Sequence, residues 1–222
     1  SATVIVTSIV HSPLNGDNVI RCTVVPAMPI TMDDIGMVLR LEAMDDGAFS
    51  GSERVDLWCE HNFEVAFTAH VDESMTFAMP AGATRAITVG SCENTGAYAG
   101  TVSAYSARGP RRDGVLKPDI VATGGDVTSA VPGGWYRRMS GTSMASPHVA
   151  GAAALLLERH PDWTTAEVKD QLLTSATADG STGILPNTSW GHGRLHVWRA
   201  VNGDIPLPTA PVLRSVRQDG ED

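Results

Sequence analysis

The spacing of hydrophobic residues changes near Pro80 and divides the chain into two parts. Before that point, short runs alternate between apolar and polar positions, which is typical of strands with one buried face. Clusters of turn-forming residues separate these runs. We therefore predict a β-rich module over residues 1–78, an antiparallel β-sandwich-like structure whose strands carry the sequences NVIRCTVV, MVLRLEA, RVDLWC and FEVAFTAH.

Beyond Pro80 the pattern favours an α/β domain over residues 79–205 with a parallel sheet. The runs RAITVGS and KPDIVA are short and almost continuously apolar. Strands that are buried on both faces of a parallel sheet have this character, because helices cover both faces. The chain is thus predicted to combine an α/β domain with an antiparallel β-rich module, followed by a surface or mobile tail over residues 206–222.

Two helices of normal length and a short third one are predicted in the α/β domain. The first runs from Ser143 to His160, with residues 152–157 expected to be buried. The second begins at Thr164 or Thr165, either of which is a favoured capping residue. Its inner face would carry Val168, Leu172 and Leu173, and the third helix is expected near residues 195–201.

Charge and composition limit the classes of partner. The net charge is −9, and the excess lies in residues 1–78, which hold 12 Asp and Glu against 3 Lys and Arg. Such a module repels phosphates, so nucleic acid is excluded as its partner. No apolar run approaches the roughly 20 residues of a membrane span. The three cysteines lack metal-binding spacing, and they are Cys22, Cys59 and Cys92.

Ser143 begins the first predicted helix, and two interpretations of it stay open at this point. Serine is a favoured N-cap and proline is favoured in the first helical turn, so Ser143 and Pro147 can simply start a helix. Alternatively, Ser143 is a nucleophile. A helix begins with unpaired N–H groups and a partial positive charge, and these stabilise the oxyanion that forms when a nucleophile placed there attacks a carbonyl.

The segment GTSMASPHVAG, residues 141–151, resembles the nucleophile motif of the subtilisin-like serine peptidases, the subtilases, at every specified position of G-T-S-M-A-x-P-x-V-A-G. Flanking segments resemble the family in the same order, so the likeness covers about 120 residues, from Pro80 to Ala200. The chain departs from the family pattern at Ala107 and Thr123. The flanking segments are PAGATRAITVGS, YSARGPRRDGVLKPDIVATGG, HPDWTTAEVKDQLLTSA and GHGRLHVWRA.

The resemblance implies the C-terminal portion of a subtilase catalytic domain, which hydrolyses polypeptide substrates through an acyl-enzyme on Ser143. It implies that residues 1–78 are a module inserted into that domain. It also implies supporting roles for Gly141, Thr142 and Met144 around the nucleophile. The family's D-[ST]-G and H-G-T-H motifs and its oxyanion asparagine segment do not occur in residues 1–142. We therefore expect an N-terminal half of the same protein to supply the Asp, His and Asn, and this chain to be almost inert alone.

Other titratable residues of the chain do not complete a catalytic triad by this reasoning. One histidine is interpreted as a packing residue or as a residue that supports the site without touching the substrate, and a second as a structural residue. Two aspartates are interpreted as turn or capping residues, and three histidines as surface residues of the acidic module. In that order, they are His148 and His192, Asp119 and Asp126, and His11, His61 and His70.

Two alternatives to a peptidase remain. A pseudoprotease or binding module would keep the scaffold without the chemistry, although the intact GTSMASP segment argues against it. A carbohydrate-binding role for residues 1–78 is suggested by Trp58 alone. The expected chemistry requires no cofactor, and calcium is compatible with the family but no ligands can be assigned. The resemblance favours a secreted or cell-envelope location over a cytoplasmic one.

Overall fold

The computed structural model describes residues 2–9, 19–26, 72–77 and 80–203. Contacts divide the chain into two compact units, Ser1–Val71 and Asp72–Asp222. This boundary lies slightly before the change of sequence pattern near Pro80, since residues 72–77 bond to the second unit through Thr76, whose N–H donates to the carbonyl of Arg108 at 2.9 Å.

The first unit contains one described pair of strands. β1 (Ala2–Ile9) pairs antiparallel with β2 (Val19–Pro26), with Ala2 opposite Pro26 and Ile9 opposite Val19. β2 corresponds to the predicted strand NVIRCTVV. The described residues do not include the other three predicted strands, Trp58, the three histidines of the module or the predicted tail. The β-sandwich therefore remains a prediction.

The second unit is built on a parallel pair of strands, as the sequence predicts. β3 (Val89–Cys92) and β4 (Ile120–Thr123) run side by side with Val89 opposite Ile120. β4 is buried on both faces: Ile120 and Ala122 pack under the helices, while Val121 packs against Cys92 and Trp190. The loop between the strands contains only a 3-10 turn, η1 (Gly96–Tyr98).

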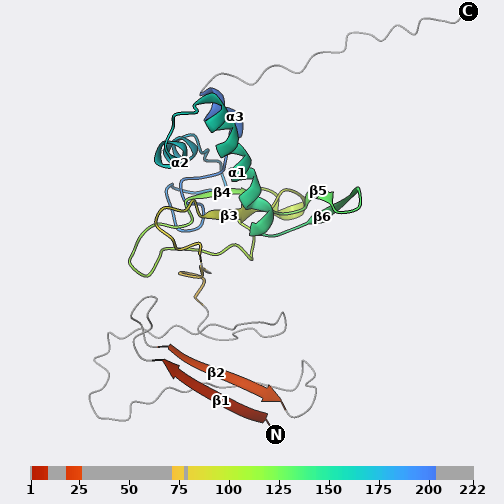
Figure 1. The fold of residues 1–222 in the computed structure, drawn as a ribbon, viewed down its shortest axis with the longest axis vertical. Coiled ribbons are helices and arrows are strands. Elements are labelled where there is room, and N and C mark those ends of the chain that lie inside the picture. The colour runs from red at the N-terminus through yellow and green to blue at the C-terminus, as the bar shows by residue number, and fades with distance from the viewer. Residues whose placement is uncertain (1, 10–18, 27–71, 78–79, 204–222) are drawn as a thin grey trace, which may run out of the picture. The chain divides into compact units, whose positions relative to one another are not determined.

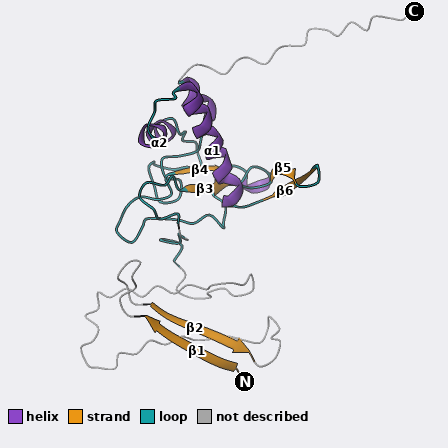
Figure 2. Ribbon diagram, viewed as in Figure 1, coloured by secondary structure: helices purple, strands orange, loops and turns teal. Residues whose placement is uncertain are grey.

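Three α-helices share one core with the parallel pair (Figure 2). They are α1 (Thr142–Arg159), α2 (Thr165–Thr174) and α3 (Val197–Asn202). α2 begins with a reciprocal capping box between Thr164 and Glu167, as its sequence allows. Val168 and Leu172 of α2 are buried as predicted, and Leu173 is partly buried.

α1 is less buried than the sequence analysis expects. Of residues 152–157 only Ala152 and Leu156 are buried, whereas Leu155 and Leu157 are 44% and 43% exposed. The prediction of a continuous buried segment is wrong because successive side chains turn about 100° around a helix, and the described neighbours cover one stripe of it. The buried stripe of α1 consists of Ala145, Val149, Ala152 and Leu156.

A β-hairpin leaves the parallel pair just before α1, and the sequence analysis does not predict it (Figure 1). β5 (Val127–Val131) pairs antiparallel with β6 (Trp135–Met139), with Val127 opposite Met139 at the base. Its turn contains Gly133 and Gly134, which have φ of 92° and 80°. Within the described part of the chain, no helix has the length and apolar character to cross a membrane.

Candidate functional site

Ser143 is the second residue of α1 and does not cap the helix. The N-cap is Gly141, which offers no side chain for capping. Pro147 lies in the second turn rather than the first, and its missing N–H cannot bond to the carbonyl of Ser143 four residues earlier. The interpretation of Ser143 as a simple N-cap is therefore wrong, and its hydroxyl is not used to start the helix.

The side chain of Ser143 is exposed, although Ala145 two residues later is completely buried. Among the bonds formed between described residues, none involves the hydroxyl or the N–H of Ser143. Both groups lie in the first turn of an 18-residue helix, where unpaired N–H groups and the helix dipole favour negative charge. This arrangement is suited to stabilising an oxyanion next to the serine hydroxyl.

The turn before Ser143 is tied to the carboxyl-terminal edge of the parallel pair. The N–H groups of Gly124 and Gly125 both lie 3.1 Å from the carbonyl oxygen of Cys92, at the end of β3. The N–H of Gly141 in turn donates to the carbonyl of Gly124 at 2.9 Å. Sites outside the carboxyl ends of parallel strands are the usual location of function in open α/β sheets.

Gly124 has no room for a side chain. A Cβ built there would lie 2.3 Å from Oγ of Ser91 and 2.6 Å from the carbonyl oxygen of Gly141. Ser91 is itself fixed, because its hydroxyl lies 2.9 Å from that of Ser103 and its N–H donates to Ser106 at 3.0 Å. These three serines are buried and form a polar cluster next to Gly124, in the turn that leads to the nucleophile. No local sequence pattern indicates this cluster, because its three serines meet only in the folded chain.

The predicted supporting residues surround Ser143. Gly141 has φ of 154° and ψ of 160°, a conformation that residues with a side chain rarely adopt. The N–H of Met144 donates to the carbonyl of Gly141 at 2.9 Å, and Met144 and Thr142 are both half-buried. The roles expected for these side chains around an oxyanion stay predictions.

Asp119 belongs to a buried ion network and not to a turn. Lys117 and Lys169 lie 2.6 Å and 2.8 Å from its two carboxylate oxygens, and the N–H of Thr88 donates to it at 2.7 Å. Burial alone raises the pKa of Asp119, but these bonds outweigh it and hold the pKa below its ordinary value. Asp119 precedes β4, at the opposite end of the strand from Ser143, so it does not orient a catalytic base.

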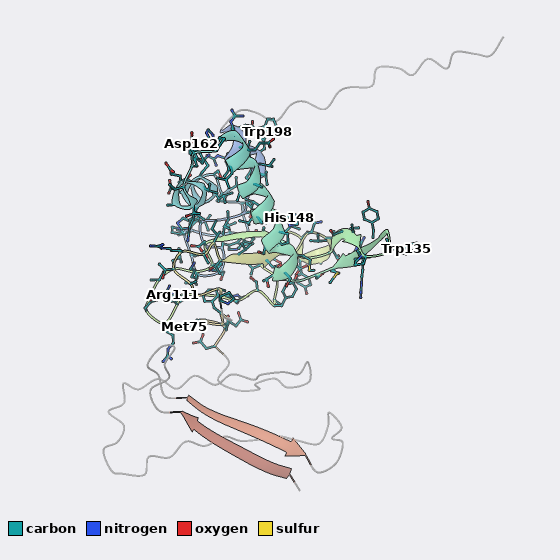
Figure 3. The ribbon with its side chains drawn as sticks, viewed as in Figure 1. Met75, Arg111, Trp135, His148, Asp162 and Trp198 are labelled. Carbon is teal, nitrogen blue, oxygen red and sulfur yellow. The ribbon has the colours of Figure 1, made fainter. Side chains whose placement is uncertain are left out.

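The two described histidines expected to be structural differ in their surroundings. His148 is exposed on α1 and its Nδ1 lies 2.9 Å from the carbonyl oxygen of Met144 (Figure 3). The exposure of His148 disagrees with a packing role, whereas a role in supporting the nucleophile turn through the carbonyl of Met144 stays a prediction. The N–H of His192 donates to the carbonyl of Asp119 at 2.9 Å, which supports its structural interpretation. Neither histidine bonds to Ser143.

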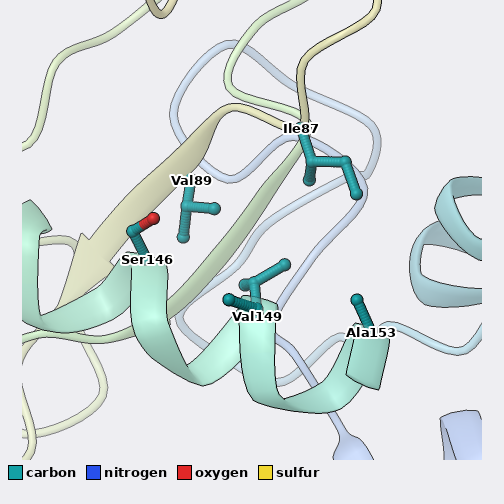
Figure 4. Close-up of a pocket in the computed structure, with 6 residues that line it drawn as sticks. Ile87, Val89, Ser146, Val149 and Ala153 are labelled. Carbon is teal, nitrogen blue, oxygen red and sulfur yellow. The ribbon is translucent and has the colours of Figure 1, made fainter. Parts of the chain in front are cut away.

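An apolar hollow lies along α1 beyond the nucleophile (Figure 4). Figure 4 shows Ser146, one turn after Ser143, at one end of the hollow. No group of three or more metal-binding side chains occurs within the described ranges. The hollow is lined by Ile87, Val89, Ser146, Val149, Ala150 and Ala153.

The chain is similar to known peptidases over part of its length. It is 46% identical over 83 residues to a subtilisin of Bacillus pumilus, covering 37% of this chain and 30% of that protein. It is 38% identical over 125 residues to the subtilisin-like protease SBT4.15 of Arabidopsis thaliana, covering 50% of this chain and 16% of the plant protein. The chain thus spans less than a third of the length of these relatives.

The fold is also similar to that of a known protease. The structure of the CspB protease of Clostridium perfringens matches 57% of this chain and 28% of its own chain, with a TM-score of 0.51 and 32% sequence identity. The sequence profile of the subtilase family matches residues 51–193, which is more than half of the chain and begins inside the acidic first part. The chain therefore belongs to the subtilase family of peptidases.

Proposed function

We propose that Ser143 is the nucleophile of a serine endopeptidase. Its Oγ attacks the carbonyl carbon of a peptide bond while a histidine takes the hydroxyl proton. The C–N bond then breaks, the histidine returns the proton to the leaving amine, and water hydrolyses the acyl-enzyme. The observation that carries this proposal is the exposed Ser143 in the first turn of α1, in a chain that belongs to the subtilase family.

The histidine, the aspartate that orients it and the oxyanion asparagine come from polypeptide outside this chain. Residues 1–142 lack the family motifs for all three, and no described histidine reaches Ser143. The exposed flank of α1 supports this assignment, because Ala150 and Leu157, seven residues apart and thus on the same side of the helix, present apolar surface that a further segment of the same protein would cover. The chain by itself is then almost inert.

The substrate of the complete protein is a polypeptide, and the proposed chemistry requires no cofactor. Calcium binding by the complete protein stays a prediction without assigned ligands. A secreted or cell-envelope location agrees with the family assignment and is part of the proposal.

A fluorophosphonate probe, which reacts with activated serines, tests the proposal. We expect rapid labelling of the complete protein, no labelling of Ser143→Ala, and unchanged labelling of Ser146→Ala, which alters an exposed serine one turn away. The isolated chain should react at least about 10³-fold more slowly, because it lacks the base and one oxyanion donor.

Two outcomes contradict the proposal. Equal labelling of the isolated chain and the complete protein would place the base within this chain. A folded complete protein that is not labelled at all would be a pseudoprotease.

A further inference from the structure

The β5–β6 hairpin presents aromatic and cationic side chains to solvent. Trp135 and Tyr136 are 74% and 77% exposed, and Arg137 and Arg138 are exposed next to them. Figure 3 shows Trp135 on the hairpin, away from α1 to α3. Trp, Tyr and Arg are the residues that most often dominate binding energy at interfaces. An exposed group of them in a soluble domain indicates a binding surface.

The side chains of β6 divide between two faces. Because alternate residues of a strand point to the same side, Trp135, Arg137 and Met139 share one face, and Tyr136 and Arg138 share the other. Met139 is 41% exposed and precedes Ser143 by four residues. The face of Trp135, Arg137 and Met139, called here the Arg137 face, therefore leads along the strand toward the nucleophile.

The number of residues between Arg137 and Ser143 limits the distance between the Arg137 face and the nucleophile. Arg137 precedes Ser143 by six residues, so at roughly 3.3 Å per residue it lies within about 20 Å of it. An extended substrate advances by the same rise. A side chain within about six positions of the bond that Ser143 attacks can therefore meet the guanidinium of Arg137.

The base of the hairpin is held to the same turn as the nucleophile. The N–H of Asp126, just before β5, donates to the hydroxyl of Ser140 at 2.9 Å, and the hydroxyl of Thr95 donates to the carboxylate of Asp126. Ser140 is followed by Gly141, which bonds to Gly124. These bonds fix the direction in which the hairpin leaves the site.

The cationic groups of the hairpin are not neutralised within the described part of the chain. The ion pairs found there join other residues, and neither Arg137 nor Arg138 takes part in one. A guanidinium binds a carboxylate through two parallel hydrogen bonds, so an Asp or Glu side chain is its matching ligand.

We infer that the Arg137 face selects polypeptide substrates that carry an acidic residue near the cleaved bond. Arg137 pairs with the substrate carboxylate, and Trp135 packs against a neighbouring substrate side chain. The inference rests on the proposed function, because it assigns specificity to the same site. An anionic membrane fits the hairpin less well, since clusters of about four to eight Lys and Arg bind acidic lipids, whereas β6 carries two arginines.

The test uses the complete protein and pairs of peptides that differ only by Asp or Asn at one position on either side of the cleaved bond. We expect kcat/KM to be about three- to tenfold higher for the Asp peptide at one position within this reach. Arg137→Gln should bring this ratio to about one, mainly by lowering kcat/KM for the Asp peptide. The preference should shrink with added salt, as expected for an exposed ion pair.

Arg138→Gln is the matched control, because it removes the same charge from the opposite face of the same strand. It should leave the preference intact. An equal loss with both variants, or no acidic preference in the unaltered protein, overturns the inference. Unchanged peptide selectivity together with Arg137-dependent binding to phosphatidylserine vesicles also overturns the inference, because the hairpin would then be a membrane anchor.

Fluorophosphonate labelling of Ser143 separates this inference from the proposed function. Labelled protein without acidic preference disproves the substrate class alone. Unlabelled protein disproves the proposed function, and the inference falls with it.

Discussion

The N–H of Gly141 lies 2.9 Å from the carbonyl oxygen of Gly124, and this bond joins the helix that carries Ser143 to the end of the parallel sheet. Gly124 follows β4 and Gly141 is the N-cap of α1, so this bond lies at the base of the loop that contains the hairpin. The position of the nucleophile therefore depends on space around two glycines that lie 17 residues apart in sequence.

Gly124→Ala should slow the reaction of Ser143. The added methyl group would overlap Ser91 and the carbonyl of Gly141, so the nucleophile turn must move. A displacement of about 1 Å costs on the order of 10²-fold in rate, and we expect fluorophosphonate labelling of the complete protein to fall between about tenfold and a hundredfold. Gly180→Ala is the control, because its Cβ would meet nothing within 4 Å. Unchanged labelling of Gly124→Ala would show that this contact does not position the site.

Asp119→Asn should destabilise the fold in a pH-dependent manner. It leaves Lys117, whose side chain is 1% exposed, without its counter-ion, and we expect a loss of about 3 kcal/mol in the free energy of unfolding at neutral pH. Because the pKa of Asp119 is lowered in the folded state, its contribution is complete above the ordinary pKa near 4 and is lost as the pH falls through the folded value. The difference between the two proteins should therefore shrink below about pH 4.

Urea denaturation at neutral pH and at about pH 3 measures this effect. Asp113→Asn provides the comparison, because Asp113 pairs with Arg111 at an exposed position. We expect little change in stability for Asp113→Asn. A stability difference for Asp119→Asn that stays constant with pH would contradict the role assigned to the ion network.

Peroxide should inactivate the complete protein through Met144. Met144 adjoins Ser143, and oxidation replaces its apolar thioether with a bulkier polar sulfoxide in the turn that holds the nucleophile. Met144→Leu should retain most fluorophosphonate labelling after peroxide, whereas Met139→Leu, at a more exposed methionine on β6, should stay sensitive. Equal sensitivity of both variants would place the damage elsewhere.

Leu156→Ala should destabilise the domain far more than Leu157→Ala. Leu156 is completely buried in the core that α1 shares with β4. Its truncation should lower the free energy of unfolding of this chain by about 3 kcal/mol, because apolar burial is lost and a cavity forms. Leu157 is 43% exposed, so the same truncation should cost about 0.5 kcal/mol or less. Denaturation of the two variants measures the difference, and similar losses would mean that both side chains are buried in solution.

Local pattern was sufficient for several elements of the second unit. The apolar runs before Cys92 and Thr123 predicted β3 and β4 because a strand covered on both faces leaves few polar positions. Thr164 or Thr165 as a capping residue predicted the start of α2, since a cap acts within the first helical turn, and the structure shows that the cap is Thr164. The hairpin of β5 and β6 was missed, because all of β6 is exposed and alternating burial gives no signal there.

The sequence by itself determined the family, the parallel strands and the segment that carries Ser143, because these features are recorded in residue order and local spacing. Only the tertiary structure decided that Gly141, and not Ser143, caps α1, that Asp119 is a buried ion partner of Lys117 and Lys169, and that one stripe of α1 is covered. Burial and ion pairing depend on which distant segments meet. The order of residues determines these contacts between distant segments only through the complete fold.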